Sequence, residues 1–154
     1  MSGTRDRYGC QAPLSISAPS PVNEATRGMG PRVPENGPMK YILLMYGDEQ
    51  VWNALTPEQM EKVYDEHRAY SEALTKAGAL EGGYELKPVA TATSVKFEGG
   101  KARTMDGPFA ETKEQLAGYY VIAVPNLEDA ISWAERMPGM TDGTVEVRPL
   151  AMGA

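Results

Sequence analysis

Two short apolar runs constrain the fold of this chain more than any other feature. Residues 41–46 read YILLMY and residues 119–124 read YYVIAV. A strand that is solvated on one face alternates apolar and polar side chains, and neither run does so. Both are therefore predicted to be strands covered on both faces, and the rest of the molecule must supply that cover.

Two helices are predicted to cover one of these faces. The first helix follows an expected loop at residues 48–55 and has a capping box at Thr56 and Gln59, Pro57 in its first turn, and a stop at Gly78. The second is capped by Asn126. The apolar stripe of the first helix, spaced by three and four residues, consists of Met60, Val63, His67, Tyr70, Leu74 and Ala77. His67 therefore points toward the sheet.

The remaining strands complete an α+β pattern. Residues 80–86 are predicted to be a strand with a bulge or bend at Gly82-Gly83, and residues 144–150 the last strand. Residues 91–97 and 102–105 flank EGGK, which is typical of a hairpin loop. The order favours a ferredoxin-like sandwich with an added β-hairpin. Two helices cover only one sheet face, so a homodimer packed sheet against sheet is predicted.

Composition excludes several classes of protein. A net charge of −6 argues against nucleic-acid and anionic-membrane partners. No run of about 18 apolar residues is present to span a membrane. Cys10 is the only cysteine and His67 the only histidine, so neither a disulfide framework nor a zinc site is predicted. A cytoplasmic location fits this cysteine usage. At 154 residues, one domain is the natural expectation.

The first 38 residues differ from the rest. Six of the 12 prolines lie among Ser, Gly and Arg there, with no hydrophobic periodicity. Such a segment cannot bury enough apolar area to offset the entropy lost on ordering. Residues 1–38 are predicted to be a disordered leader, or sequence upstream of a true start at Met39. The folded domain is predicted to span residues 39–154.

The run DGPFAETKEQLAGYY, which begins at Asp106, carries a family resemblance. Together with MKYILLMYGDE, EHRAYSEAL and GTVEVRPL, it resembles the DGPF-type proteins of the YCII-related family. The resemblance covers Met39 to about Leu150. It implies a ferredoxin-like fold of the dimeric α+β-barrel type. Some members of the family are encoded beside extracytoplasmic-function sigma factors, and relatives are proposed to be small-molecule enzymes that use a helix histidine and an acid.

On this sequence the resemblance assigns those two catalytic roles to His67 and Asp106. An imidazole titrates near neutral pH and can transfer a proton, especially when a carboxylate orients one ring nitrogen. The strand before Asp106 is expected to run in the sheet that His67 faces, and the two side chains are therefore predicted to lie within about 6 Å of each other at a pocket rim. The alternatives are that His67 is a core residue bonded to a backbone carbonyl and that Asp106 only begins a turn.

Substrate-binding roles are predicted for four residues around this pair. Phe109 is expected to return to the apolar interior, while Glu111 and Lys113 line the mouth of the pocket or simply form an exposed polar loop. Tyr46 is one of five tyrosines that could supply phenolic donors, the others being Tyr64, Tyr70, Tyr119 and Tyr120.

Two functions remain open at this point. The first is a cofactor-free enzyme that uses a single base in an apolar pocket for proton abstraction, elimination or isomerisation of a small molecule. The second is a non-catalytic module that binds a small molecule and acts in regulation, linked to a sigma-factor system. The discriminating observation is whether His67 faces a cavity that solvent can reach.

Overall fold

The structure, a computed structural model, describes residues 37–151, which lie in one compact unit, Pro34–Ala154. The predicted leader falls almost wholly outside the described residues, so its boundary stays a prediction. In chain order the elements are β1 (Met39–Gly47), α1 (Glu49–Asn53), α2 (Pro57–Lys76), β2 (Leu80–Glu85), the 3-10 turn η2 (Val89–Thr91), β3 (Thr93–Glu98), β4 (Lys101–Asp106), β5 (Gln115–Val124), α3 (Leu127–Glu135) and β6 (Thr144–Pro149).

Four strands form an antiparallel sheet in the order β2-β5-β1-β6. The two apolar runs are its central strands, β1 and β5, and their register pairs Leu43 with Tyr120. A central strand has neighbours for its backbone N–H and C=O groups on both sides, which suits a run that has few polar side chains. The prediction that both runs are strands is confirmed, while full burial of their side chains within the described chain is observed on one face only.

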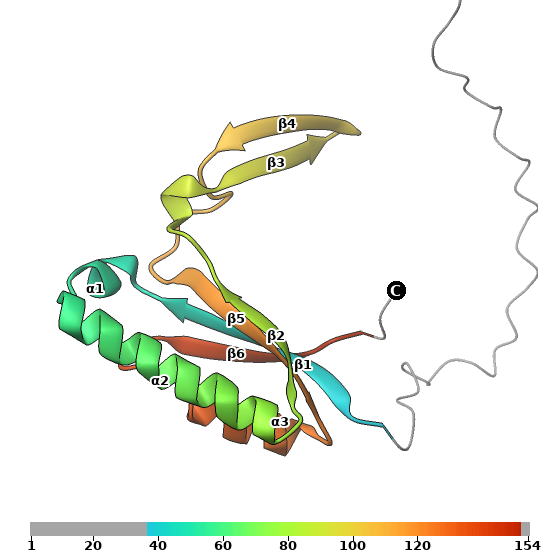
Figure 1. Ribbon diagram of the computed structural model, residues 1–154. Coiled ribbons are helices and arrows are strands. Elements are labelled where there is room, and N and C mark those ends of the chain that lie inside the picture. Colours follow the sequence, from blue (N-terminus) through green and yellow to red (C-terminus); the bar gives the residue numbers. More distant parts are fainter. Residues whose placement is uncertain (1–36, 152–154) are drawn as a thin grey trace, which may run out of the picture. The chain divides into compact units, whose positions relative to one another are not determined.

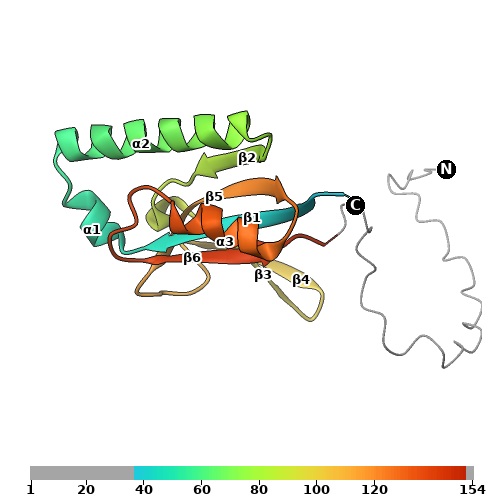
Figure 2. The ribbon, with the colours of Figure 1, turned by 90° about the horizontal axis from the view of Figure 1, so that it is seen from below.

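Helices α2 and α3 cover one face of this sheet (Figures 1 and 2). Leu43 of β1, Leu74 of α2 and Ile122 of β5 are fully buried between them. Burying a side chain of this size contributes about 1.5–3 kcal/mol. The other buried members of the core are Tyr41, Tyr70, Ala79, Val124, Ala130 and Met137.

The start of α2 is fixed by local chemistry. The Thr56 side chain accepts a hydrogen bond from the Gln59 backbone N–H, and the Gln59 side chain accepts one from the Thr56 backbone N–H. These two bonds satisfy donors that a helix N-terminus leaves unpaired. The helix ends at Lys76 and is followed by Gly78, whose φ of 68° only glycine adopts at low cost. Both predicted boundaries are therefore confirmed, which places His67 in the middle of α2.

The opposite face of the sheet has no helix over it in the part of the chain that the structure describes (Figure 1). On this face Ile42 lies opposite Val121, and Leu44 lies opposite Tyr119. All four side chains are only half-buried. An apolar face without a covering layer is an unusual surface for a single soluble chain.

The predicted bulge in β2 is present. The register between β2 and β5 shifts between Leu80 and Gly82. A Cβ on Gly83 would lie 2.7 Å from the Tyr119 carbonyl oxygen and 2.8 Å from the Tyr120 ring. Gly83 therefore leaves the space in which the Tyr120 ring lies, while a Cβ on Gly82 would meet nothing within 4 Å.

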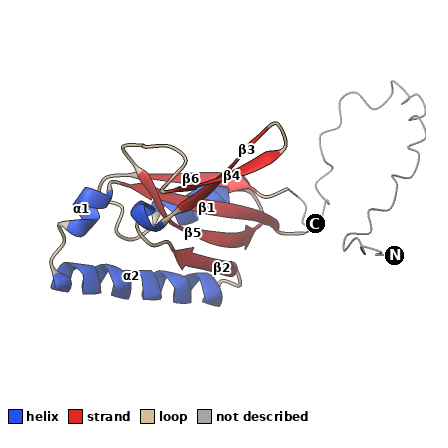
Figure 3. Cartoon of the chain, turned by 90° about the horizontal axis from the view of Figure 1, so that it is seen from above, coloured by secondary structure: helices blue, strands red, loops and turns tan. Residues whose placement is uncertain are grey.

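The hairpin of β3 and β4 forms a separate two-stranded sheet. It lies on the side of the four-stranded sheet that the helices leave uncovered, and in Figure 3, seen from that side, it lies in front of the sheet (Figures 1 and 3). The prediction of a hairpin at residues 91–105 is confirmed. The expectation that the strand before Asp106 runs in the helix-covered sheet is wrong, because β4 pairs only with β3 among the described strands.

Two further expectations need correction. Residues 48–55 were expected to be a loop, but Glu49–Asn53 form a short helix, α1, whose first turn is capped by the Asp48 carboxylate. Phe109 was expected in the interior, but its side chain is 89 % exposed. The turn that contains it leaves the hairpin without reaching the core, since Gly107 bonds back to Ala92 and Ser94 at the base of the hairpin.

The architecture is thus a mixed α+β fold with antiparallel sheets and few helices. It is compatible with the ferredoxin-like sandwich that the element order predicts, with the β3–β4 hairpin inserted between the two halves. Within residues 37–151, no helix has the length and apolar character needed to cross a membrane.

Candidate functional site

The only histidine of the chain, His67, lies in the middle of α2, opposite the central strand β5. His67 sits on the inward side of the helix, as the apolar stripe predicts, and is half-buried. Its Nδ1 lies 3.1 Å from the Tyr120 hydroxyl of β5. His67 is thus bonded to a side chain on a neighbouring strand, not to the backbone carbonyl that the structural alternative required.

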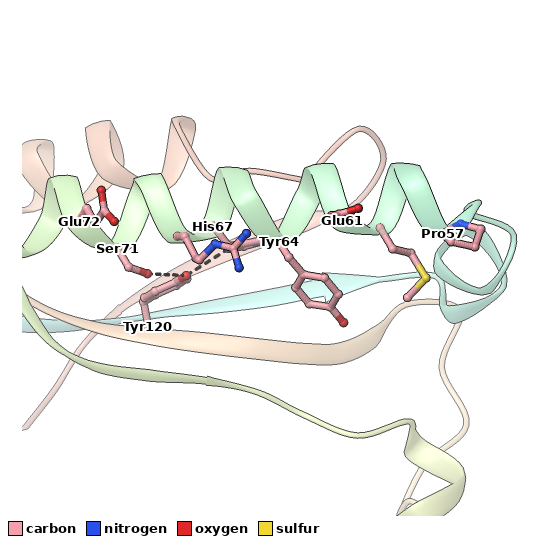
Figure 4. Close-up of a pocket in the computed structure, with 9 residues that line it drawn as sticks. Pro57, Glu61, Tyr64, His67, Ser71, Glu72 and Tyr120 are labelled. Atoms are coloured by element: carbon pink, nitrogen blue, oxygen red, sulfur yellow. Dashed lines mark hydrogen bonds between the residues drawn. The ribbon is translucent and has the colours of Figure 1, made fainter.

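Tyr120 joins His67 to a second polar side chain. Its hydroxyl also lies 3.2 Å from the Ser71 Oγ, one helical turn after His67 (Figure 4). The Tyr120 and His67 rings are nearly parallel, with centroids 6.1 Å apart, and Tyr70 contacts the Tyr120 ring edge-on at 5.3 Å. The Tyr70 hydroxyl is itself fixed by donating to the Trp133 carbonyl oxygen. Tyr120 is therefore held by contacts on both its ring and its hydroxyl.

The second ring nitrogen of His67 is free. Among the described residues, no hydrogen bond reaches Nε2, and no buried polar side-chain atom lacks a partner. Nε2 therefore retains access to solvent. The loop after α3 passes close to it, since a Cβ on Gly139 would lie 3.8 Å from Nε2. One nitrogen is fixed by the protein and the other is open to a ligand.

The electrostatics of the site keep the imidazole neutral at pH 7. Burial lowers the pKa of His67 below its ordinary value of 6.5, because the charged form loses solvation. The negative charges of Glu85 and then Glu66 oppose this shift and raise the pKa, but the net change is downward. A neutral imidazole has a lone pair on one nitrogen, which is the state needed to accept a proton.

A neighbouring tyrosine links the helix to the acid that acts on His67. Tyr64 extends from α2 on the same side as His67, and its hydroxyl donates to the Glu85 carboxylate at 3.3 Å (Figure 4). Burial and the Glu85 charge raise the pKa of Tyr64, so it stays protonated. The Trp52 ring of α1 meets Tyr64 edge-on at 6.0 Å. These three side chains form one rim of the site.

Two concave regions meet at this cluster. An open groove of about 870 Å³ runs along α2, and a more enclosed pocket of about 630 Å³ reaches from α2 past β2 to the ends of β1 and β5. Both are large enough for a small organic molecule. The residues that line both are Tyr64, His67, Ser71 and Tyr120.

The residues predicted from the sequence separate into two groups. Tyr46 lines the pocket that contains His67. Asp106, Phe109, Glu111 and Lys113 line neither concave region, and all four are exposed.

Asp106 ends β4 in the separate hairpin, where it pairs with Thr93. It is not among the charges that shift the pKa of His67, which are Glu85 and Glu66. Within one chain the structure therefore does not bring Asp106 to the imidazole.

Three residues of the cluster were not singled out from the sequence. Ser71 follows His67 by four positions, which is one helical turn, so helical spacing alone could have found it. Tyr120 was only one of five candidate tyrosines, and Glu85 was not considered. Both lie on strands far from α2 in the chain, and no local pattern reports which strand residue faces a given helix turn.

The donor set does not resemble a metal site. Within residues 37–151, no three His, Cys, Asp or Glu side chains converge in a way that could hold a metal ion. The cluster around His67 contains the phenols of Tyr64 and Tyr120, the Ser71 alcohol and the Glu85 carboxylate. These groups bind and move protons, and they fit a neutral or weakly polar organic ligand.

Fold and site together define an α+β protein with a histidine-centred pocket between a helix and the edge of an antiparallel sheet. Comparison with known proteins shows the family to which it belongs. The YCII-related domain model matches residues 39–152, so the chain belongs to the YCII-related family. It is also 38 % identical over 116 residues to an uncharacterised protein of Rhizobium meliloti (strain 1021), which covers 74 % of this chain and 94 % of that protein.

Proposed function

We propose that this YCII-related protein is a cofactor-free enzyme that moves a proton on a small organic molecule, with His67 as the base. The observation that carries the proposal is the asymmetry of the imidazole. Nδ1 is bonded to Tyr120, Nε2 is open to the pocket, and burial lowers the pKa so that the ring is neutral at pH 7. A general base needs this combination of an oriented ring, a free lone pair and a pKa near or below the working pH.

Tyr120 and Ser71 determine which nitrogen carries the proton. If Tyr120 donates its hydroxyl proton to Ser71, it accepts one from Nδ1–H, and Nε2 is then a bare base. If Ser71 donates to Tyr120, Tyr120 donates to Nδ1, and Nε2–H is then an acid. Both arrangements use the same two contacts of 3.1 and 3.2 Å. When Nε2 takes a proton from the substrate, the imidazolium carries a proton on each nitrogen, and Nε2–H can then return its proton in the acid step that isomerisation and elimination both require.

The two aromatic rings around the imidazole limit the substrate. Tyr64 and Tyr120 give the pocket ring surfaces, and Glu85 places a negative charge beside it. Proton abstraction next to a carbonyl, elimination or isomerisation of a neutral molecule suits this setting. An anionic substrate would be repelled by Glu85.

The DGPF loop, residues 106–113, is proposed to act in the pocket of a second copy of the chain. Asp106, Phe109, Glu111 and Lys113 do not reach the pocket of their own chain. We propose that the protein is a homodimer packed through the uncovered sheet face, in the cytoplasm, and that any ligand contact made by this loop is made in the pocket of the partner. The apolar pairs Ile42–Val121 and Leu44–Tyr119 support this packing.

The test uses the fact that His67 is the only histidine. The protein is incubated in heavy water with a panel of neutral carbon acids, namely β-diketones and hydroxyaryl ketones, and exchange of the acidic C–H is followed by NMR. The wild type is expected to accelerate exchange of at least one compound by about 100-fold or more over the His67→Gln variant, the usual scale for a positioned base.

Matched variants separate the proposed roles. Tyr120→Phe should reduce the rate, whereas Tyr41→Phe should not, because Tyr41 lines neither concave region and its hydroxyl contacts the Met39 sulfur instead. Compounds that shift the His67 ring resonance without exchange would favour the alternative of a non-catalytic binding module. Exchange that is equally fast in His67→Gln would refute the proposed base.

A further inference from the structure

The β3–β4 hairpin carries its most apolar side chains in the open. Phe97 is 72 % exposed and Val95 is 53 % exposed. The register pairs Val95 with Thr104 and Phe97 with Ala102, and directly paired residues of an antiparallel ladder point to the same side. Val95 and Phe97 therefore lie on the same side of the hairpin, with Thr93 and Asp106 at its base, and none of these side chains is buried.

The other side of the hairpin is charged. It presents Lys96 beside Arg103 and Glu98 beside Lys101. Hairpins that stand in water on both sides have no reason to sort apolar and charged residues in this way. The sorting predicts that the Val95–Phe97 side packs on another surface.

Hydrogen bonds fix the base of the β3–β4 hairpin at its entry and at its exit. The Glu49 carboxylate accepts a hydrogen bond of 2.7 Å from the Val89 backbone N–H at the entry. At the exit, the Ser94 hydroxyl donates to the Gly107 carbonyl oxygen at 2.8 Å, and the Gly107 N–H donates to Ala92. An isolated two-stranded hairpin is only marginally stable in water. A hairpin with a fixed base and exposed apolar side chains is suited to pack on a surface of another molecule.

We propose that the β3–β4 hairpin is a clasp that packs its Val95–Phe97 side on a second copy of this chain. The inference rests on the sheet-to-sheet homodimer proposed above and names the element that completes it. The hairpin lies on the side of the sheet that the helices leave uncovered, which is also the side of the apolar face (Figure 1). In a two-fold assembly each copy offers the same arm and the same face, so one contact made twice covers both.

The exposed area is of the size that a dimer needs. Tyr84 and Phe97 are each 72 % exposed and Phe109 is 89 % exposed. At about 200 Å² for each aromatic side chain, these three offer roughly 450 Å² per copy, or roughly 900 Å² for two copies. Specific interfaces bury about 1,000 Å² or more in total, and the half-buried sheet face adds to this sum.

A second copy fits better than other occupants. The net charge of −6 opposes binding to nucleic acid or to anionic lipid. The half-buried apolar side chains of β1 and β5 and the exposed Val95 and Phe97 are complementary in kind, and this chain contains both. Clasping by the arm also places the DGPF loop, which begins where β4 ends at Asp106, on the partner molecule.

The experiment measures the oligomeric state of the full chain by sedimentation over a range of concentrations. The wild type should form a dimer. Phe97→Ser should raise the dimer dissociation constant by about 100-fold or more, because each dimer loses the side chain twice. Lys96→Ser, one position away on the charged side, should change it by less than about threefold. Circular dichroism of each variant checks that the fold is retained.

Each other outcome overturns something specific. A wild-type monomer at high micromolar concentration would overturn both the clasp and the dimer. A Phe97→Ser dimer as tight as the wild type would overturn the clasp alone. Binding of the wild type to phosphatidylcholine vesicles that Phe97→Ser abolishes would overturn the second copy as occupant in favour of a lipid surface. The proton-transfer proposal is tested independently, by the exchange rate of the His67→Gln variant.

Discussion

The helix-covered half of the molecule and the β3–β4 hairpin differ in how far their side chains are buried and bonded within the chain. In the first, Leu74 and Ile122 are fully buried, and the hydroxyl of Tyr120 bonds to both His67 and Ser71. In the second, every residue of β4 is exposed, and Phe97 is among the most exposed apolar side chains. The core between the helices and the sheet is complete within one chain. The hairpin has a fixed base, and no described element covers its apolar side chains Val95 and Phe97.

This difference explains why the predicted pair of His67 and Asp106 separates. His67 belongs to the half that the chain completes by itself, and its neighbours are fixed by the packing of α2 on β5. Asp106 belongs to the hairpin, whose surroundings one chain does not define. The acids that act on His67 within the chain are Glu85 and Glu66. The comparison therefore predicts that variants in the two halves affect different measurements.

The largest difference should be in folding stability. Leu74→Ala should lower the free energy of unfolding by about 2–5 kcal/mol, because it leaves a cavity in the core. Phe97→Ala, measured where the protein is dilute enough to be monomeric, should lower it by less than about 0.5 kcal/mol, as for other exposed positions. Urea unfolding of the two variants checks this. A large effect of Phe97→Ala in the monomer would show that the hairpin packs on its own chain.

The next effect concerns the space that holds the Tyr120 ring. Gly83→Ala places a methyl group within 2.7 Å of a backbone oxygen and 2.8 Å of that ring, so it should cost about 1–3 kcal/mol of stability and displace Tyr120 from His67. Gly82→Ala is the matched control, since its Cβ meets nothing within 4 Å. Thermal unfolding and the His67 ring resonance report the two consequences. Equal effects of the two variants would contradict the role assigned to Gly83.

The buried imidazole should make stability depend on pH. Because burial lowers the pKa of His67 in the folded state, the unfolded chain binds the proton more readily. The stability of the wild type should be fully present above about pH 6.5 and should fall as the pH drops from there toward the folded pKa. The free energy of unfolding of the wild type and of His67→Gln is measured between pH 8 and 5. The difference between the two curves isolates the contribution of His67, since the other groups titrate alike in both proteins. Parallel curves would mean that the pKa is unchanged on folding.

The smallest expected effect identifies the acid that acts on the imidazole. Glu85→Gln removes a negative charge that raises the pKa of His67, so that pKa should fall further. Asp106→Asn should leave it unchanged in the monomer. NMR titration of the single histidine needs no assignment to distinguish the two. If Asp106→Asn shifts the pKa as much as Glu85→Gln does, Asp106 lies at the imidazole, as the family resemblance implied.

Much of the fold could be predicted because its signals are local. The capping box at Thr56 and Gln59 and the stop at Gly78 fixed the ends of α2, and both are observed. The bulge next to Gly82 and the hairpin around EGGK were likewise marked by glycine. The short helix α1 was missed because residues 49–53 are too few to show a helical period.

The exposure of Phe109 was missed for another reason. An aromatic residue after a turn is usually expected to pack inward, and the sequence does not say that the turn ends on a hairpin that stands apart. The predicted contact between Asp106 and His67 failed for the same reason. A strand pattern reports that a segment is extended, but it does not report which sheet the segment joins.

By itself the sequence determined that His67 faces inward, because helical spacing puts it in line with Val63, Tyr70 and Leu74. It also determined that the two central strands need cover on both faces. Only the tertiary structure decided that His67 meets Tyr120 and that Asp106 lies on a separate hairpin. The physical reason is range: caps, turns and helical periodicity act over a few neighbouring residues, whereas the partner of a side chain depends on which distant strand the chain brings beside it.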